Sequence, residues 1–265
     1  MNTRISEAFQ RLESSSSKAL LPYVTPEYPF PGSTLPLLEA LEAEGANLLE
    51  MGIPFSDPLA DGPTIQHASE IAIRNGATLP LILDTVRRFR SRSSLPILLM
   101  GYANPIYHYG VRRFAEDCVA AGVDGVIVPD LPPEEAGELK KESEQRGLSM
   151  VFLIAPTTPD ARIGEIDAQS TEMSYCVSVR GVTGARTGFG AGEEFERFLE
   201  RVRKGVKKKF VVGFGVASPE HVRSIWRHAD GAVVGSALLQ SMQGSSGVSE
   251  AVQRAAAFFR TLRPT

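Results

Sequence analysis

The sequence has few cysteines, no long apolar run and no excess of charge of either sign. Its two cysteines, Cys118 and Cys176, cannot form a disulfide framework, and they suit a reducing compartment. No apolar run approaches the roughly 18–20 residues that a membrane span requires, and residues 1–9 lack the continuous apolar core of a secretory signal. Lys and Arg number 28 against 31 Asp and Glu, so nothing indicates nucleic-acid binding. We therefore expect a soluble, compact, cytoplasmic protein.

The 265-residue chain alternates between short apolar runs and segments with helical spacing. Eight runs are near-continuously hydrophobic, which is typical of strands covered on both faces. They lie at residues 19–25, 47–51, 96–101, 125–128, 149–154, 175–179, 210–214 and 231–234. Helical spacing is found at residues 5–12, 35–44, 79–90, 112–121, 134–146, 194–205, 219–228 and 248–262.

This alternation predicts the fold class. Eight strands, each followed by a helix, are the count of an α/β protein of the (β/α)8, or TIM, barrel type, with eight parallel strands and a short N-terminal helix. An open, doubly wound sheet has the same alternation. The eightfold count and the absence of an early Gly-x-Gly-x-x-Gly turn favour the barrel. Because no linker with a shift in composition is present, we expect one domain over residues 1–265.

An acidic residue inside one of the apolar runs is the first candidate for catalysis. Glu50 stands near the C-terminal end of the second run, and catalytic side chains of a barrel sit at that end of the strands. Burial disfavours the ionised carboxylate, so we expect a raised pKa, in a range useful for proton transfer. A carboxyl paired with an arginine or with backbone amides is the structural alternative.

Two aspartates follow in the next loop, which three prolines stiffen. Asp57 precedes a proline in a common turn pair and is expected to be a structural or contact residue. Asp61 could cap the helix that begins near Pro63. The alternative is that Asp61 faces Glu50 as a second carboxyl of one site.

Glycine pairs follow three neighbouring runs and indicate a phosphate site. They are Gly181 and Gly184 after the sixth run and Gly213 and Gly215 at the end of the seventh; after the eighth, Gly235 is followed by Ser236. In a barrel these loops commonly hold a phosphate, because glycines let backbone N–H groups approach it. Residues 180–192 hold five glycines and are expected to act as a lid over a phosphorylated substrate, with a plain surface loop as the alternative.

Other catalytic chemistries lack their residues at the strand ends. A Schiff-base aldolase needs a lysine there, and the lysines fall on helices or at the opposite mouth of the barrel. A metal-dependent aldolase needs clustered histidines, whereas His67, His108, His221 and His228 are scattered. Acid–base catalysis by carboxyls, without metal or cofactor, is what remains.

Four segments in matching order resemble the tryptophan synthase α subunit family. They are LEMGIPFSDPLADGPTIQ (49–66), GVTGAR (181–186), VGFGVASPE (212–220) and GSAL (235–238). The first is highly specific, and the resemblance spans nearly the whole chain. It implies a (β/α)8 barrel that cleaves indole-3-glycerol phosphate to indole and glyceraldehyde 3-phosphate in a retro-aldol reaction.

The resemblance also implies a role for each matching residue. Glu50 would be the general acid–base that protonates C3 of the indole ring and helps to release the aldehyde. Asp61 would accept a hydrogen bond from the indole N–H and stabilise the positive charge that develops there. Tyr175 would line the site and Thr183 would be a lid residue that closes near Asp61. Pocket-lining or ring-contacting groups would be Tyr23, Ile65, Tyr102 and Phe214, and the phosphate cradle would be Gly184, Gly213, Gly235 and Ser236.

A partner is implied as well. Members of the family work beside a β subunit that uses pyridoxal phosphate and receives indole through an internal channel, in an αββα heterotetramer. The chain itself would need no cofactor. Pro54, Asp57 and the region of residues 104–105 fall where that partner would be contacted.

The sequence departs from the family pattern in three places. Residues 25–29 (TPEYP) stand where a Gly-Asp-Pro turn is usual, and Val179-Arg180 replaces a more usual pair in the lid. Tyr23 adds a hydroxyl at a position that is often Phe.

Two other functions are weighed against this lyase. Another phosphosugar-handling barrel, such as an isomerase or the preceding indole-forming synthase, would be favoured by a lysine or histidine at a strand end. A subunit kept mainly to regulate a β partner is the second alternative, and the presence of both Glu50 and Asp61 argues against a complete loss of catalysis.

Overall fold

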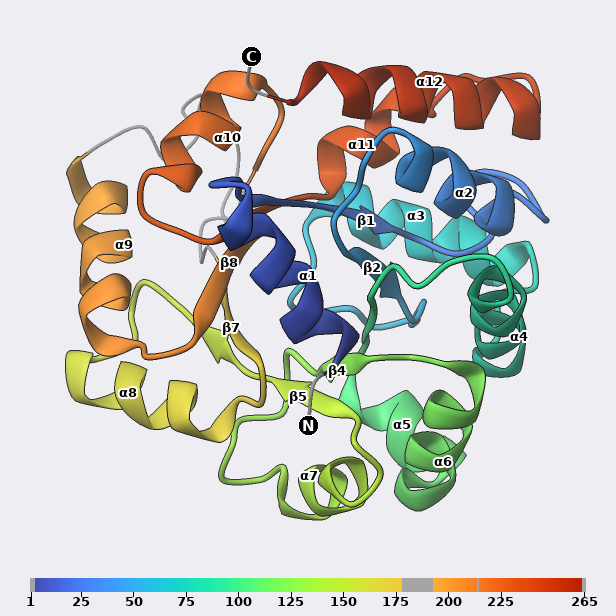
Figure 1. Cartoon of the computed structure of the whole chain (residues 1–265). Coiled ribbons are helices and arrows are strands. Elements are labelled where there is room, and N and C mark those ends of the chain that lie inside the picture. The colour runs from blue at the N-terminus through green and yellow to red at the C-terminus, as the bar shows by residue number, and fades with distance from the viewer. Residues whose placement is uncertain (1–2, 178–192, 214, 264–265) are drawn as a thin grey trace.

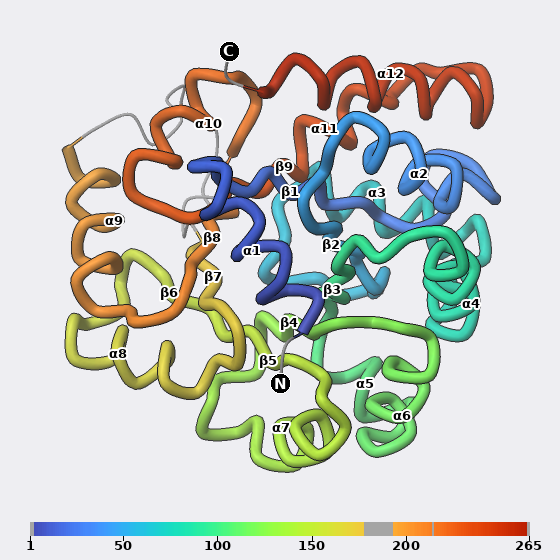
Figure 2. The backbone as a smooth tube through the Cα atoms, viewed as in Figure 1, coloured from blue at the N-terminus to red at the C-terminus, as the bar shows by residue number. Residues whose placement is uncertain are grey.

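A computed structural model describes residues 3–177, 193–213 and 215–263. Within them, nine parallel strands form one sheet in the order β5-β4-β3-β2-β1-β9-β8-β7-β6. Their bounds are β1 Ala19–Val24, β2 Leu49–Gly52, β3 Ile97–Met100, β4 Gly125–Ile127, β5 Ser149–Val151, β6 Leu153–Ile154, β7 Met173–Val177, β8 Lys209–Gly213 and β9 Gly231–Val234. The two outermost strands, β5 and β6, belong to one chain segment, so the sheet closes on itself (Figure 2).

Phe152 separates β5 from β6 at the point of closure. β5 pairs with β4, β6 pairs with β7, and the Phe152 carbonyl accepts a hydrogen bond from Tyr175 N at 3.1 Å. The predicted (β/α)8 barrel is confirmed, but its fifth run, 149–154, forms two short strands. β7 begins two residues before the predicted sixth run. The buried Ser174 hydroxyl is satisfied there by Asp167 Oδ1 at 2.8 Å, which lets a polar residue lie inside the barrel wall.

Twelve helices lie in the described residues (Figure 1). They are α1 Arg4–Ser14, α2 Thr34–Ala43, α3 Pro63–Arg74, α4 Leu79–Arg90, α5 Ala103–Tyr109, α6 Val111–Ala121, α7 Gly137–Glu144, α8 Asp160–Gln169, α9 Glu193–Gly205, α10 Pro219–Trp226, α11 Ser236–Ser241 and α12 Val248–Thr261. Helices α2 to α12 surround the strands, and α1 lies across one mouth (Figure 1). None of the described helices combines the length and apolar character that a membrane span requires.

Glycines and a serine set helix ends where the sequence predicts them. Gly45, just after α2, and Gly122, the C-cap of α6, have φ of +84° and +90°, a left-handed conformation that glycine adopts at low cost. At the start of α10, the Ser218 hydroxyl accepts a hydrogen bond from the backbone N–H of His221. At Gly45 and Gly122 the chain therefore turns sharply out of the helix toward the next strand.

Polar side chains join neighbouring strands at the N-terminal mouth. Each lies just before a strand and accepts a backbone N–H near the start of the apolar run that precedes that strand along the chain. The pairs are Asn47 with Leu20 (2.8 Å), Asp124 with Ile97 (2.8 Å), Thr171 with Met150 (3.0 Å) and Asp230 with Phe210 (3.0 Å). Because a buried N–H without an acceptor is costly, these contacts favour one register at every second interface of the barrel.

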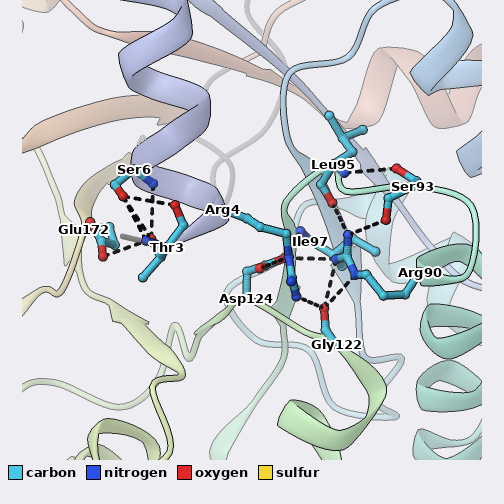
Figure 3. A network of polar contacts seen from close by, with 10 residues as sticks. All are labelled: Thr3, Arg4, Ser6, Arg90, Ser93, Leu95, Ile97, Gly122, Asp124 and Glu172. Carbon is cyan, nitrogen blue, oxygen red and sulfur yellow. Dashed lines mark hydrogen bonds and ion pairs between the residues drawn. The ribbon is translucent and has the colours of Figure 1, made fainter. Parts of the chain in front are cut away.

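Helix α1 covers this same mouth. Its buried face meets the core through Ile5, Ala8 and Phe9. Arg4 Nε donates to Asp124 Oδ1 at 2.7 Å, and Asp124 Oδ2 accepts from Arg90 Nη2 at 2.9 Å (Figure 3). Thr3 Oγ1 also donates to Glu172 Oε1 at 3.0 Å. The network fixes α1 over the N-terminal ends of the strands, at the end of the barrel away from the cavity described next.

Candidate active site

A cavity of about 300 Å³ lies at the C-terminal mouth of the barrel. Six strands contribute to its wall, together with residues that follow β2, β8 and β9 and with helices α3 and α11. The lining residues are Tyr23, Glu50, Ala60, Asp61, Gly62, Ile65, Met100, Tyr175, Val177, Gly213, Gly215, Val216, Ala217, Val233, Gly235, Ser236, Ala237 and Gln240. Eight predicted site residues are therefore brought to one cavity, namely Tyr23, Glu50, Asp61, Ile65, Tyr175, Gly213, Gly235 and Ser236.

Glu50 is the most deeply placed carboxyl of this cavity. Glu50 lies on β2 and is only 1% exposed. The Tyr175 hydroxyl hydrogen-bonds to the carboxyl, while Oε2 has no partner among the described residues. Burial raises the pKa of Glu50 to about 8; the Tyr175 bond opposes this rise, and the charge of Asp61 adds to it. The carboxyl is thus largely neutral at pH 7 and able to donate a proton.

Asp61 reaches the same cavity from the loop between β2 and α3. Its backbone N–H donates to Pro58 O at 3.0 Å. The Tyr102 hydroxyl accepts from Ala60 N at 2.9 Å and hydrogen-bonds to the Asp61 carboxyl, so Tyr102 holds the loop at two points. Burial raises the pKa of Asp61 to about 6, against the effect of the Tyr102 bond. The carboxyl is mostly ionised at pH 7.

The structure distinguishes between the roles considered for Asp61 and Asp57. Gly62, not Asp61, is the N-cap of α3, and no side chain caps that helix. Asp61 is therefore free to serve the cavity. Asp57 accepts a hydrogen bond from the Ser56 hydroxyl and does not line the cavity, as expected of a structural or contact residue.

Two glycines make room for the tyrosines of the cavity. A Cβ on Gly213 would lie 2.2 Å from the Tyr175 hydroxyl oxygen, and a Cβ on Gly52 would lie 2.3 Å from that of Tyr23. Either approach is far too close for a side chain, so these positions need glycine. Gly213 thus serves the ring of Tyr175 as well as the cavity wall. Tyr175 is the third residue of β7 rather than the first of a strand.

Gly235 and Ser236 form a further part of the wall, with Gly235 beside Tyr23. Gly235 is the single residue between β9 and α11, and Ser236 begins α11. No lysine or arginine is among the described residues that line the cavity. An anion held at this wall would depend on backbone N–H groups, since the first N–H groups of a helix have no acceptor within it.

Three predicted binding residues, Thr183, Gly184 and Phe214, lie outside the described residues. The same is true of the predicted lid, 180–192, and of the departure at residues 179–180.

Sequence reasoning missed several lining residues. Met100 and Val177 are the last residues of β3 and β7. Their position at strand ends is a signal that could have found them, but apolar side chains there resemble ordinary core. Gln240 Nε2, on α11, donates to Thr64 Oγ1 of α3 at 3.1 Å and borders the cavity. That contact joins residues 176 positions apart and has no local sequence signal.

Histidines take no part in the cavity wall that the structure describes. His67, His108 and His221 lie on three different helices, α3, α5 and α10, so they are scattered as predicted. No group of three or more His, Cys, Asp or Glu side chains in the described residues could hold a metal ion.

The fold and the cavity define a class: a (β/α)8-barrel enzyme with one buried and one half-buried carboxyl at the C-terminal mouth. Residues 9–264 match the family model described as tryptophan synthase alpha chain. A curated tryptophan synthase alpha chain from Chlorobium luteolum is 50% identical over 253 residues, which cover 93% of this chain and 94% of that protein. The chain belongs to the tryptophan synthase alpha chain family.

Solved structures agree with this assignment. A crystal structure of tryptophan synthase subunit alpha from Legionella pneumophila is similar at a TM-score of 0.89, with 35% identity and coverage of 98% of this chain and 97% of that one. A chain of the tryptophan synthase a2b2 complex from Pyrococcus furiosus is similar at 0.85, with 43% identity and coverage of 92% and 97%.

Membership of the family fixes the reaction class. The protein is a lyase of tryptophan biosynthesis, and it catalyses the half-reaction that cleaves indole-3-glycerol phosphate. Pyridoxal phosphate belongs to the β subunit, and the alpha chain itself needs no cofactor. A β subunit is its partner.

Proposed function

We propose that Glu50 and Asp61 carry out the cleavage of indole-3-glycerol phosphate, with Glu50 as the acid–base residue. The observation that carries this proposal is a buried carboxyl oxygen, Glu50 Oε2, that has no partner in the described residues although it shares a cavity with a second carboxyl. A buried acceptor without a partner is costly, and such groups are common where a substrate completes the site.

The chemistry requires a proton on C3 of the indole ring before the bond to the glycerol carbon can break. Glu50, neutral at pH 7, gives its proton to C3, and the positive charge then lies on the ring nitrogen. The new Glu50 carboxylate takes the proton of the hydroxyl on the carbon attached to C3. The carbon–carbon bond breaks, its electron pair returns to the ring, and indole and the aldehyde leave. Glu50 is protonated again, so no proton is gained or lost.

Asp61 acts on the opposite side of the ring in this proposal. Its carboxylate, ionised at pH 7, accepts a hydrogen bond from the indole N–H and stabilises the positive charge that protonation creates. Tyr102 holds the loop that carries it. A charge fixed in a site of low polarity stabilises the transition state more than a mobile one in water would.

The remaining predicted residues bind the substrate. Tyr23, Ile65 and Tyr175, which line the cavity, contact the ring, and the backbone of Gly235 and Ser236 binds the phosphate. We assign Tyr102 to the loop behind Asp61. Gly213 completes the phosphate side. Thr183 keeps its predicted role in the lid, Gly184 in the phosphate cradle, and Phe214 as a pocket-lining or ring-contacting residue.

The assembly and location are part of the proposal. We propose an αββα heterotetramer, by analogy with the a2b2 complex named for the Pyrococcus furiosus protein. Pro54, Asp57 and the Asn104–Pro105 region would contact the β subunit, and Leu59, 84% exposed in the same loop, supports this because a large apolar side chain is poorly placed in water. The barrel would work as one domain, 1–265, in the cytoplasm.

Indole release from indole-3-glycerol phosphate tests the proposal, with and without the β subunit. Glu50→Gln should abolish cleavage and leave phosphate binding nearly intact, because general acid–base catalysis contributes roughly 10²–10⁴-fold. A Glu50→Gln protein that keeps more than about a tenth of the wild-type rate would contradict the assignment. Wild-type protein that releases no indole in either condition would favour the regulatory subunit considered above.

A further inference from the structure

A tyrosine hydroxyl shares the cavity with the two carboxyls and has no part in the steps above. Tyr23 lies on β1 and is the register partner of Glu50 on β2. Paired residues of adjacent strands project to the same side of the sheet, so both side chains face the barrel interior. Both line the cavity.

The hydroxyl is held on the mouth side of Glu50. It lies against Gly52, where a Cβ would approach its oxygen to 2.3 Å and the ring carbon Cζ to 3.0 Å. Gly52 is two residues after Glu50, hence on the same face of β2 and one step nearer the open mouth. The glycine thus leaves a place for one hydroxyl beside the carboxyl, toward the space a substrate would fill.

Both carboxyls act on this hydroxyl. Burial raises the pKa of Tyr23, the charge of Asp61 raises it further, and that of Glu50 adds a smaller effect. A side-chain hydrogen bond with Thr25 lowers the pKa of Tyr23 in part, and the electrostatic effect of Tyr102 raises it slightly. Strand β9 and helix α11, which pack against β1, contain no titratable side chain. The hydroxyl therefore stays protonated and acts as a hydrogen-bond donor.

We propose that the Tyr23 hydroxyl is a positioning group that donates a hydrogen bond to whichever of the two carboxyls is ionised. It would face Asp61 before proton transfer and turn to Glu50 once that residue has given up its proton. Glu50 Oε2, which has no partner in the described residues, is the acceptor it would meet. The inference rests on the proposed roles of Glu50 and Asp61.

Tyr23→Phe tests this inference because it removes one oxygen and keeps the ring. The hydroxyl has one proton and stabilises only the first carboxyl to ionise, so its loss should raise the lower apparent pKa in the pH profile of indole release by about one unit and leave the upper one nearly unchanged. We expect kcat at pH 7 to fall about 10-fold or more, with a smaller change in KM. Tyr28→Phe is the matched control, since Tyr28 is equally buried but hydrogen-bonds to Gln243, which is not among the lining residues.

The outcomes separate this inference from the proposed function. Unchanged kcat and unchanged pH limbs in Tyr23→Phe would overturn it. A lower kcat with unmoved limbs would overturn it too, because that result indicates packing alone. Glu50→Gln and Asp61→Asn are measured beside it: if both are severely impaired while Tyr23→Phe behaves as wild type, only the role of Tyr23 fails. If both remain active, the proposed function fails instead.

Discussion

Replacing Glu50 by Gln should make the protein more stable than the wild type, and this difference in unfolding free energy should grow as the pH rises. The same substitution should abolish activity. The pKa of this carboxyl rises from an ordinary 4.5 to about 8 because it is buried. The folded state then holds the proton more tightly than the unfolded state. The stability this gives is fully present below pH 4.5 and is lost as the pH rises through 8. Glutamine has no proton to lose, so the variant avoids this loss.

The size of the effect follows from the shift. Each pH unit between the two pKa values costs the wild type about 1.4 kcal/mol relative to the variant, or about 5 kcal/mol over the whole range. Between pH 6.5 and 8 the curve begins to level, and the expected change is about 1.5 kcal/mol. Asp61 is mostly ionised throughout this window, so it contributes little to the difference.

Urea unfolding at pH 6.5 and 8 measures this change. The difference in unfolding free energy between Glu50→Gln and wild type should grow by about 1.5 kcal/mol, with equal m-values. Glu70→Gln is the control, because Glu70 is an exposed glutamate in an ion pair with Arg74 and its substitution should show no such growth. A difference for Glu50→Gln that is the same at both pH values would refute the claim that this carboxyl is buried and neutral.

Three further predictions concern Asp61, the phosphate-binding role of Gly235 and Ser236, and the polar network at the N-terminal mouth. Asp61→Asn should lower kcat severely but incompletely, because one acceptor oxygen remains; indole release measures it, and a wild-type rate would exclude the assigned charge stabilisation. Glycerol phosphate at millimolar concentration should raise the melting temperature by mass action if Gly235 and Ser236 hold phosphate, and the absence of any shift would count against that wall. Asp124→Ala should cost about 2–4 kcal/mol in chemical unfolding, since it leaves Arg90 and the Ile97 N–H without this acceptor; a loss below about 0.5 kcal/mol would show that the network contributes little.

The sequence predicts regular elements best where local signals agree. The bounds of α4 and β9 match the predicted runs 79–90 and 231–234 to the residue. The bounds of α7 do not, because residues before Gly137 form a turn in which Glu135 N and Ala136 N both donate to Pro132 O. Helices α5 and α8 have no counterpart among the predicted runs. Helix α8 has few apolar residues, so its helical periodicity is weak, and α5 is short.

In the candidate site, too, some features can be predicted from the sequence and others cannot. Glu50 is visible in the sequence because a charged residue interrupts an apolar strand, and burial in the structure is the main cause of its raised pKa. The close approach of Gly52 to Tyr23 is not visible, since it depends on the register between two strands. The hydrogen bond between Tyr102 and the Asp61 loop is not visible either, because it joins residues far apart in the sequence. Ala60, whose N–H donates to the Tyr102 hydroxyl, is 42 positions away.

The pH dependence of kcat/KM for indole release, measured on the complex with the β subunit, tests the division of labour between the two carboxyls. Glu50 must be protonated and Asp61 ionised, so the profile should be bell-shaped, with limbs near pH 6 and pH 8. A profile that stays flat from pH 5 to 9, or that rises steadily above pH 8, would contradict this account.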